Sequence, residues 1–314
     1  MLNTLEIYSA IFKIFLLGFL GAFFVKIRWL NKDALDFLTN FLVKVTVPSL
    51  IFSVFIKESQ IFKVYNLKVF LSVNILIAGL GLLLGIISLP FIKNKNIYRE
   101  YLLLITFQNC GYLPMNLSLF LFSPQLHLKF LSYVFMYLLG FNFLMWSLGS
   151  FFMSRDKFNL KHLFNMPFLS VLFSFLLIKS NLYKFIPKTI LEVASILGKI
   201  TFPLSMIVLG AILFKREKFQ LGNLKALSIL CLTKLLILPL IVFFILIFVK
   251  IDTFLKLFIF IQSMMPSAVS LSIIAMWQKG AEDFVAEGIF LTTFLSILTI
   301  PFWLNIFKIY VING

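Results

Sequence analysis

The stretch FQNCGYLPMN, residues 107–116, is the most informative part of this sequence. It lies inside a largely apolar segment and contains three amides, a glycine and a proline: Gln108, Asn109, Asn116, Gly111 and Pro114. Proline removes a backbone donor and its ring clashes with the preceding turn, so a helix is expected to break here. In a bilayer a broken helix is tolerated only where its free backbone groups face protein or a wet cavity. The stretch therefore predicts an interrupted membrane helix.

Apolar segments of similar length recur from one end of the chain to the other. A helix needs about 20 residues to cross a hydrocarbon core roughly 30 Å thick. Candidate spans of this kind cover residues 5–25, 34–56, 68–92, 99–123, 128–153, 164–186, 189–214, 223–249, 253–278 and 283–308. The sixth is the weakest, because Lys179 and Asn181 interrupt it. Ten spans predict an all-α integral membrane protein with no soluble domain and with both termini on the same side.

The composition agrees with a membrane protein. Of 314 residues, 61% are hydrophobic and 13% charged, whereas soluble domains have about 45–50% apolar and about 25% charged residues. The net charge of +16 comes from Lys and Arg in short connectors, such as Lys93, Lys95 and Arg99. These predict contact with membrane lipids and no nucleic acid. Their distribution favours an inner (cytoplasmic) membrane protein with both termini on the non-cytoplasmic side.

An internal repeat accompanies the ten spans. The polar stretch 154–163 divides the chain into residues 1–155 and 156–314, with five spans each. An odd number of spans inverts the second half in the membrane. KVTVP at 44–48 matches KITFP at 199–203, in spans two and seven, and the prolines of spans four and nine are similarly offset. We therefore predict two inverted five-helix repeats.

Span nine repeats the polar interruption of span four. Residues 262–270 read QSMMPSAVS and supply Gln262, Pro266, Ser267 and Ser270. Two discontinuous helices at equivalent positions of inverted halves predict a binding site near the bilayer midplane. The alternative is a pair of proline kinks that serve helix packing, but the density of polar residues exceeds what a kink needs.

Three lysines, Lys44, Lys199 and Lys234, lie near the centres of their spans. A charge there costs about 2.5–3.5 kcal/mol, so such residues are expected to face the bundle interior or a cavity. No carboxylate is as deep, since Glu192 and Glu287 lie near predicted span ends. Cations without matching anions predict an anionic ligand, which could also use the positive ends of half-helices. The alternative is that a lysine snorkels or pairs with a backbone carbonyl.

Sequence signatures of enzymes, metal sites and cofactors are absent. The two histidines lie near connectors and form no zinc motif, and the two cysteines are isolated within apolar segments. Neither pattern supports a metal site or a disulfide framework. We expect no catalytic residues and no cofactor.

The motifs resemble the auxin efflux carrier family of membrane transport proteins. Asn109-x-Gly111-x-x-Pro114 looks like the crossover motif of that family's fourth helix. Its ninth and tenth helices are similar to Pro266-Ser267-Ala268-Val269, Ala275, Ser296 and Pro301-Phe302-Trp303. Its sixth and seventh helices are similar to Asn165-Met166-Pro167, Pro187, Phe202-Pro203-Leu204 and Leu209-Gly210-Ala211.

This resemblance implies a sodium/proton-antiporter-like fold with crossed discontinuous helices four and nine. It also implies substrate binding beside the crossing prolines and elevator-type movement of small organic anions such as auxin-like carboxylates, malate or malonate. One crossing peptide would hold Asn109, Gly111 and Pro114, and the other Pro266, Ser267 and Ala268. This chain has Ser270 where the family often has Asn. The difference affects which substrate is expected more than it affects the assignment to a class of transporter.

The resulting prediction is a secondary carrier of a small organic anion. Its substrate-binding residues would be Gln108, Asn109, Gly111, Pro114, Asn116, Gln262, Pro266, Ser267 and Ser270, with Lys44, Lys199 or Lys234 as charge partners. A sodium-coupled symporter of the bile-acid type is the alternative, although the expected deep Glu is missing, and an anion channel of the same topology is another. The coupling ion and a homodimeric state stay open.

Overall fold

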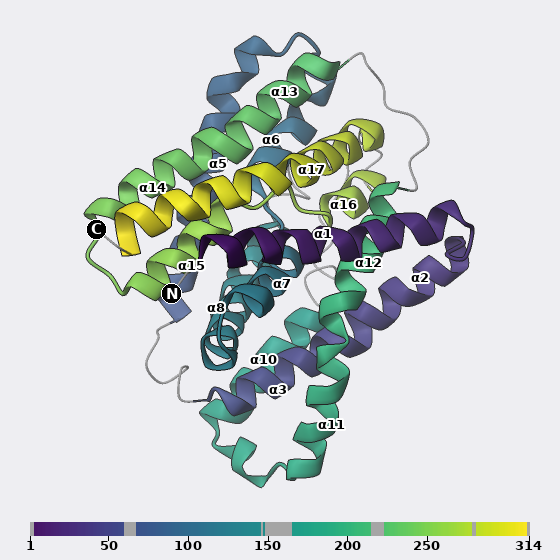
Figure 1. The fold of residues 1–314 in the computed structure, drawn as a ribbon, viewed down its shortest axis with the longest axis vertical. Helices are drawn as coiled ribbons and strands as arrows, with labels where there is room; N and C mark the ends of the chain where they lie inside the picture. Colours follow the sequence, from purple (N-terminus) through teal and green to yellow (C-terminus); the bar gives the residue numbers. More distant parts are fainter. Residues whose placement is uncertain are drawn as a thin grey trace.

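The computed structural model describes residues 3–59, 67–145, 147, 165–214, 223–277 and 281–312 (Figure 1). Within these ranges the chain is helical apart from short connections and one isolated β-bridge. Seven helices in the described ranges are long and apolar enough to span a membrane: Thr4–Lys26, Lys32–Lys57, Leu67–Phe91, Pro124–Leu144, Lys188–Phe214, Leu224–Phe248 and Glu282–Val311. The predictions of an all-helical protein and of a multi-pass membrane protein are therefore confirmed.

The remaining predicted spans are shorter or divided. Span four consists of α6 (Tyr98–Thr106) and α7 (Tyr112–Leu121), and span nine of α15 (Thr253–Ser263) and α16 (Leu271–Trp277). Span six corresponds to α10 (Met166–Lys179), which ends where Lys179 and Asn181 interrupt the apolar pattern. The predicted boundary at residue 155 lies outside the described residues.

Side-chain caps explain where several helices begin. Asn3, Asn31, Asn165 and Asp252 each accept a hydrogen bond from a backbone N–H of the first helical turn. These N–H groups have no partner inside the helix, so a cap stabilises the start of each helix by about 1 kcal/mol.

The helices form two groups. The first helix group contains α1 (Thr4–Lys26), α2 (Lys32–Phe41), α3 (Val47–Lys57), α10, α11 (Lys188–Lys199) and α12 (Thr201–Phe214). Figure 1 shows α1 crossing α12, with α3, α10 and α11 below them. Gly210 allows the close approach of α1 and α12, because a Cβ there would lie 2.7 Å from Gly18 Cα.

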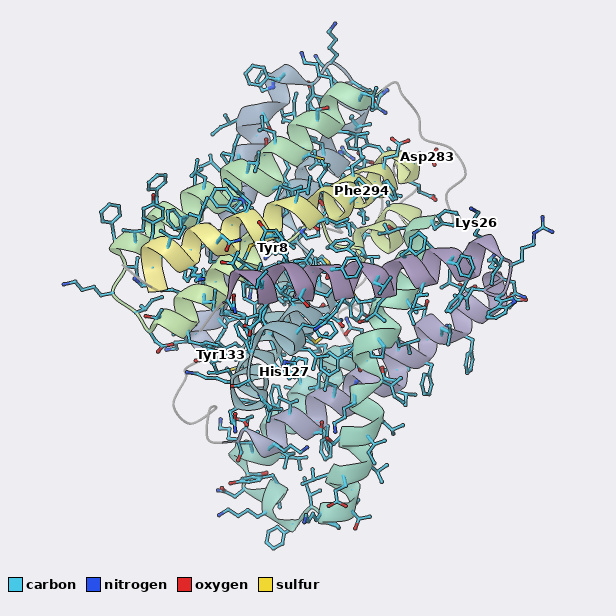
Figure 2. All side chains as sticks on the ribbon, viewed as in Figure 1. Tyr8, Lys26, His127, Tyr133, Asp283 and Phe294 are labelled. Carbon is cyan, nitrogen blue, oxygen red and sulfur yellow. The ribbon has the colours of Figure 1, made fainter. Side chains whose placement is uncertain are left out.

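The second helix group surrounds the divided helices. It contains α5 (Leu67–Ser88), α6, α7, α8 (Pro124–Leu144), α13 (Leu224–Leu232), α14 (Leu238–Phe248), α15, α16 and α17 (Glu282–Phe307). Rings from three of these helices pack together: Phe70, Tyr133 and Phe258 have centroids 5.2–5.9 Å apart. Tyr133 is labelled with His127 on α8 in Figure 2. This aromatic cluster holds α5, α8 and α15 against one another.

Both ends of the described chain lie on the same side. Lys308 Nζ donates a 3.2 Å hydrogen bond to Thr4 Oγ1. Figure 2 shows Tyr8 near this end of α1, while Lys26 lies at its other end, toward Asp283 at the start of α17. An even number of crossings is consistent with this arrangement.

Candidate functional site

The two proline-containing interruptions differ in how the proline is used. Pro114 lies in the first turn of α7, where a missing backbone N–H costs nothing because that turn has no helical acceptor. Pro266 lies between the end of α15 at Ser263 and the start of α16 at Leu271. Each predicted span thus contains a peptide outside helical geometry, at residues 107–111 and 264–270. We call these the first and second unwound peptides.

The two unwound peptides pair with each other. Asn109 N donates a 2.7 Å hydrogen bond to Pro266 O, and Ala268 N donates a 3.0 Å hydrogen bond to Phe107 O. Gln108 and Ser267 face each other in an antiparallel bridge. Backbone groups that lost their helical partners are therefore satisfied inside the protein, as the low dielectric of a membrane protein requires.

Two side chains donate hydrogen bonds to the last carbonyl groups of α6. Ser267 Oγ donates to Leu104 O at 2.8 Å, and Lys234 Nζ donates to Ile105 O at 2.5 Å. The last carbonyls of a helix have no partner within it and carry partial negative charge. A hydroxyl and an ammonium group therefore stabilise this helix end in the membrane interior.

The three candidate lysines occupy very different positions. Lys234 is 0% exposed, whereas Lys44 and Lys199 are exposed on the first helix group. Of the predicted alternatives, a place in the bundle interior holds for Lys234, whereas the exposed Lys44 and Lys199 agree with snorkelling, in which the aliphatic stem runs along apolar surface. The neighbouring threonines do meet, because Thr201 Oγ1 donates a 3.0 Å hydrogen bond to Thr46 Oγ1.

A local change of helix geometry places Lys234. Residues Thr233–Ile237 form the π-helical turn η8, two residues before Pro239. The N–H of Leu238 bonds Thr233 O, five residues back, which accommodates a proline that would otherwise clash with the preceding turn. A single inserted residue of this kind rotates the following side chains and is frequent at functional sites.

The amide side chains at the paired peptides make some of the hydrogen bonds open to them and leave other polar atoms unpaired. Gln108 Nε2 donates to Tyr137 Oη at 2.6 Å, and Gln262 Nε2 donates to Cys110 O at 3.3 Å. Asn109 Nδ2 and Gln262 Oε1 are buried and have no hydrogen-bond partner in the described part of the chain. Buried polar atoms are normally satisfied, so these two are open to a ligand or water.

Other predicted site residues lie apart from this pairing. Asn116 is on α7 and donates to Ser205 Oγ of α12 at 2.9 Å, at the boundary between the two helix groups. Ser270 Oγ donates to Met145 Sδ at 3.2 Å. Gly111 has φ −109°, and a Cβ added there would make only ordinary van der Waals contacts, so this position does not require glycine.

The structure adds residues that the sequence did not single out. Tyr137 accepts from Gln108, and Thr292 Oγ1 accepts a 3.2 Å hydrogen bond from Ser267 N. Each is one of several hydroxyl side chains in a long, mostly apolar helix, so no local pattern marks it. Glu100 is also buried, and its Oε1 accepts from Ala281 N at 3.0 Å, just before α17. Its burial depends on α17, which is distant in the sequence.

The apolar helices define a multi-pass membrane protein. The family model described as "Membrane transport protein" matches residues 150–304, from before α10 to near the end of α17. This is the auxin efflux carrier family, and the second half of the chain belongs to it, which confirms the resemblance. Among curated proteins, none matches the chain.

Proposed function

We propose that this transporter is a secondary carrier of a small organic anion such as a carboxylate, and not an enzyme. The anion binds where the two unwound peptides pair, beside Asn109, Gln262 and Lys234. The observation that carries this proposal is a pair of buried polar groups near the carboxyl end of α6. Lys234 Nζ is fully buried and bonds a carbonyl there, and Asn109 Nδ2, in the first unwound peptide that follows α6, is a buried donor without a partner among the described residues. Donors and positive charge together suit an anion.

The charge balance of the site supports an anionic substrate. Lys234 has no carboxylate partner among the described residues, and its one hydrogen bond goes to a backbone carbonyl. A buried positive charge without a counter-ion attracts an anion more strongly than it would in water, because the local dielectric is low.

The proposed architecture is ten transmembrane helices in two inverted five-helix repeats, residues 1–155 and 156–314, with helices four and nine crossed. The grouping of helices supports it, since spans one, two, six and seven form the first group and the others form the second. The Thr46–Thr201 contact, which joins the matching motifs of spans two and seven, is a further support.

Elevator-type alternating access suits this grouping. The second helix group carries both unwound peptides and would move with the anion, while the first group would stay in place. The boundary contains few polar contacts between described residues, such as Asn116 with Ser205. The rest of this boundary is largely apolar and includes the ring contact of His127 with Phe202. Apolar surfaces can slide past each other without leaving hydrogen-bonding groups unpaired.

We further propose an inner-membrane location with both termini on the non-cytoplasmic side, and lipid around the exposed apolar helices. A homodimer would use the same membrane-facing surface. The alternatives are a sodium-coupled symporter of the bile-acid type and an anion channel. A channel would give unitary currents without counterflow.

A ligand screen tests the proposal directly. Purified protein is heated with small mono- and dicarboxylates, including malate and malonate, and with matched neutral amides as controls. A ligand that binds only the folded state raises the apparent melting temperature. We expect stabilisation by one class of carboxylate and saturable uptake of that compound in proteoliposomes. Stabilisation by amides and not by carboxylates would contradict an anion site.

A further inference from the structure

Lys234 is held in place by contacts on both sides in the sequence. Thr233 hydrogen-bonds with the buried side chain of Tyr101 on α6, and Leu235 O accepts a 2.8 Å hydrogen bond from Trp303 Nε1 on α17. Three consecutive residues of η8 are thus fixed to α6 and α17. This rigidity keeps the ammonium group at Ile105 O.

The position that Lys234 occupies is one that suits a cation. It lies at the carboxyl end of the half-helix α6, where the helix dipole is negative. In carriers with discontinuous helices, such carboxyl ends and the unwound carbonyls next to them coordinate the coupling cation. The backbone of α5 also lies close to this carbonyl oxygen, because a Cβ added at Gly81 would lie 2.9 Å from Ile105 O.

We propose that Lys234 is a tethered cation that replaces a coupling ion at the carboxyl end of α6. This inference rests on the proposed function and deepens it, because a cation attached to the chain lets the site accept an anion without co-binding sodium. Lys234 is a positioning residue in this respect: it acts through α6 and the first unwound peptide. Removal of its side chain should leave a cavity that a small free cation can enter.

The thermal stability of the purified protein reports whether a cation enters this cavity, and the measurement needs no substrate. Lys234→Ala creates the cavity, Lys234→Met fills it with a neutral chain, and Lys225→Ala removes an exposed lysine of the neighbouring α13 as control. Sodium, potassium and methylammonium are compared with choline at equal ionic strength. We expect stabilisation of Lys234→Ala alone, by about 3 °C or more with the best cation at saturating concentration.

Transport provides a second readout. Wild-type uptake in proteoliposomes should be unchanged when sodium is replaced by choline on both sides. Lys234→Ala should lose at least tenfold in uptake in choline and recover part of it with the cation that stabilises it. Lys234→Met should lose as much and recover nothing, and Lys225→Ala should match the wild type.

The outcomes separate this inference from the proposed function. If the wild type carries no organic anion but Lys234→Ala is stabilised by cations, the proposed function fails and the tethered cation stands. Specific stabilisation of the wild type by sodium, or sodium-dependent uptake, overturns the inference without any variant. Equal behaviour of Lys234→Ala and Lys234→Met overturns it too, because the lysine would then be merely structural.

Discussion

The backbone N–H of Asn109 donates a 2.7 Å hydrogen bond to the carbonyl oxygen of Pro266. This bond joins the two interrupted helices at their breaks, although α6–α7 and α15–α16 belong to opposite halves of the chain. Proline has no N–H of its own, so the second unwound peptide contributes an acceptor here and Ala268 contributes the donor of the reciprocal bond. The two breaks therefore satisfy each other.

Asn109→Ala should weaken substrate binding and leave the fold intact. The Asn109 Nδ2 group is buried without a partner, so its removal breaks no bond within the described structure. A hydrogen bond to a charged ligand contributes about 1.5–3 kcal/mol, or roughly a tenfold to 150-fold change in affinity. Uptake in proteoliposomes measures the effect, with Asn40→Ala on the exposed face of α2 as control. Unchanged uptake would remove Asn109 from the site.

Ser267→Ala should destabilise the pairing of the unwound peptides. The change removes the 2.8 Å hydrogen bond to Leu104 O and leaves that buried carbonyl without its hydroxyl donor. The expected loss is about 1–3 kcal/mol in free energy of unfolding. Ser180→Ala is the matched control, because Ser180 Oγ makes the same kind of bond to Leu176 O at an exposed position. Equal melting temperatures of the two variants would contradict this role.

Gly210→Ala should separate α1 from α12. The added methyl group would meet the backbone of Gly18, which cannot move away as a flexible side chain could. Overpacking of this kind costs about 1–3 kcal/mol. Gly79→Ala on α5 has open space within 4 Å and should be neutral or stabilising by up to about 1 kcal/mol. Detergent melting curves of both variants test the difference, and a more stable Gly210→Ala would refute it.

A covalent link between Asn116 and Ser205 should stop transport. These residues join α7 of the second helix group to α12 of the first, with 2.9 Å between Asn116 Nδ2 and Ser205 Oγ. Cysteines at both positions, linked by a short reducible thiol reagent, would hold the groups in one arrangement. Uptake should fall to background and return on reduction, while each single cysteine variant should be insensitive to both treatments. Transport by the fully linked protein would exclude an elevator movement across this boundary.

The class of fold and the places where two helices break follow from the amino-acid sequence alone. Helix length, apolar composition and the effect of Pro266 or Pro114 on the backbone are local properties, so residues near each other in the chain are enough to reveal them. The motifs around these prolines also identified the family that the second half of the chain matches.

Which polar groups meet depends instead on the tertiary structure. The helix around Lys234 is apolar on all sides, so no periodic pattern showed that this side chain is buried while those of Lys44 and Lys199 are exposed. The partners of Gln108 and Ser267, Tyr137 and Thr292, come from distant helices. The pairing of Asn109 with Pro266 likewise depends on contact between the two halves, because an unwound peptide in a membrane must find its hydrogen bonds elsewhere in the protein.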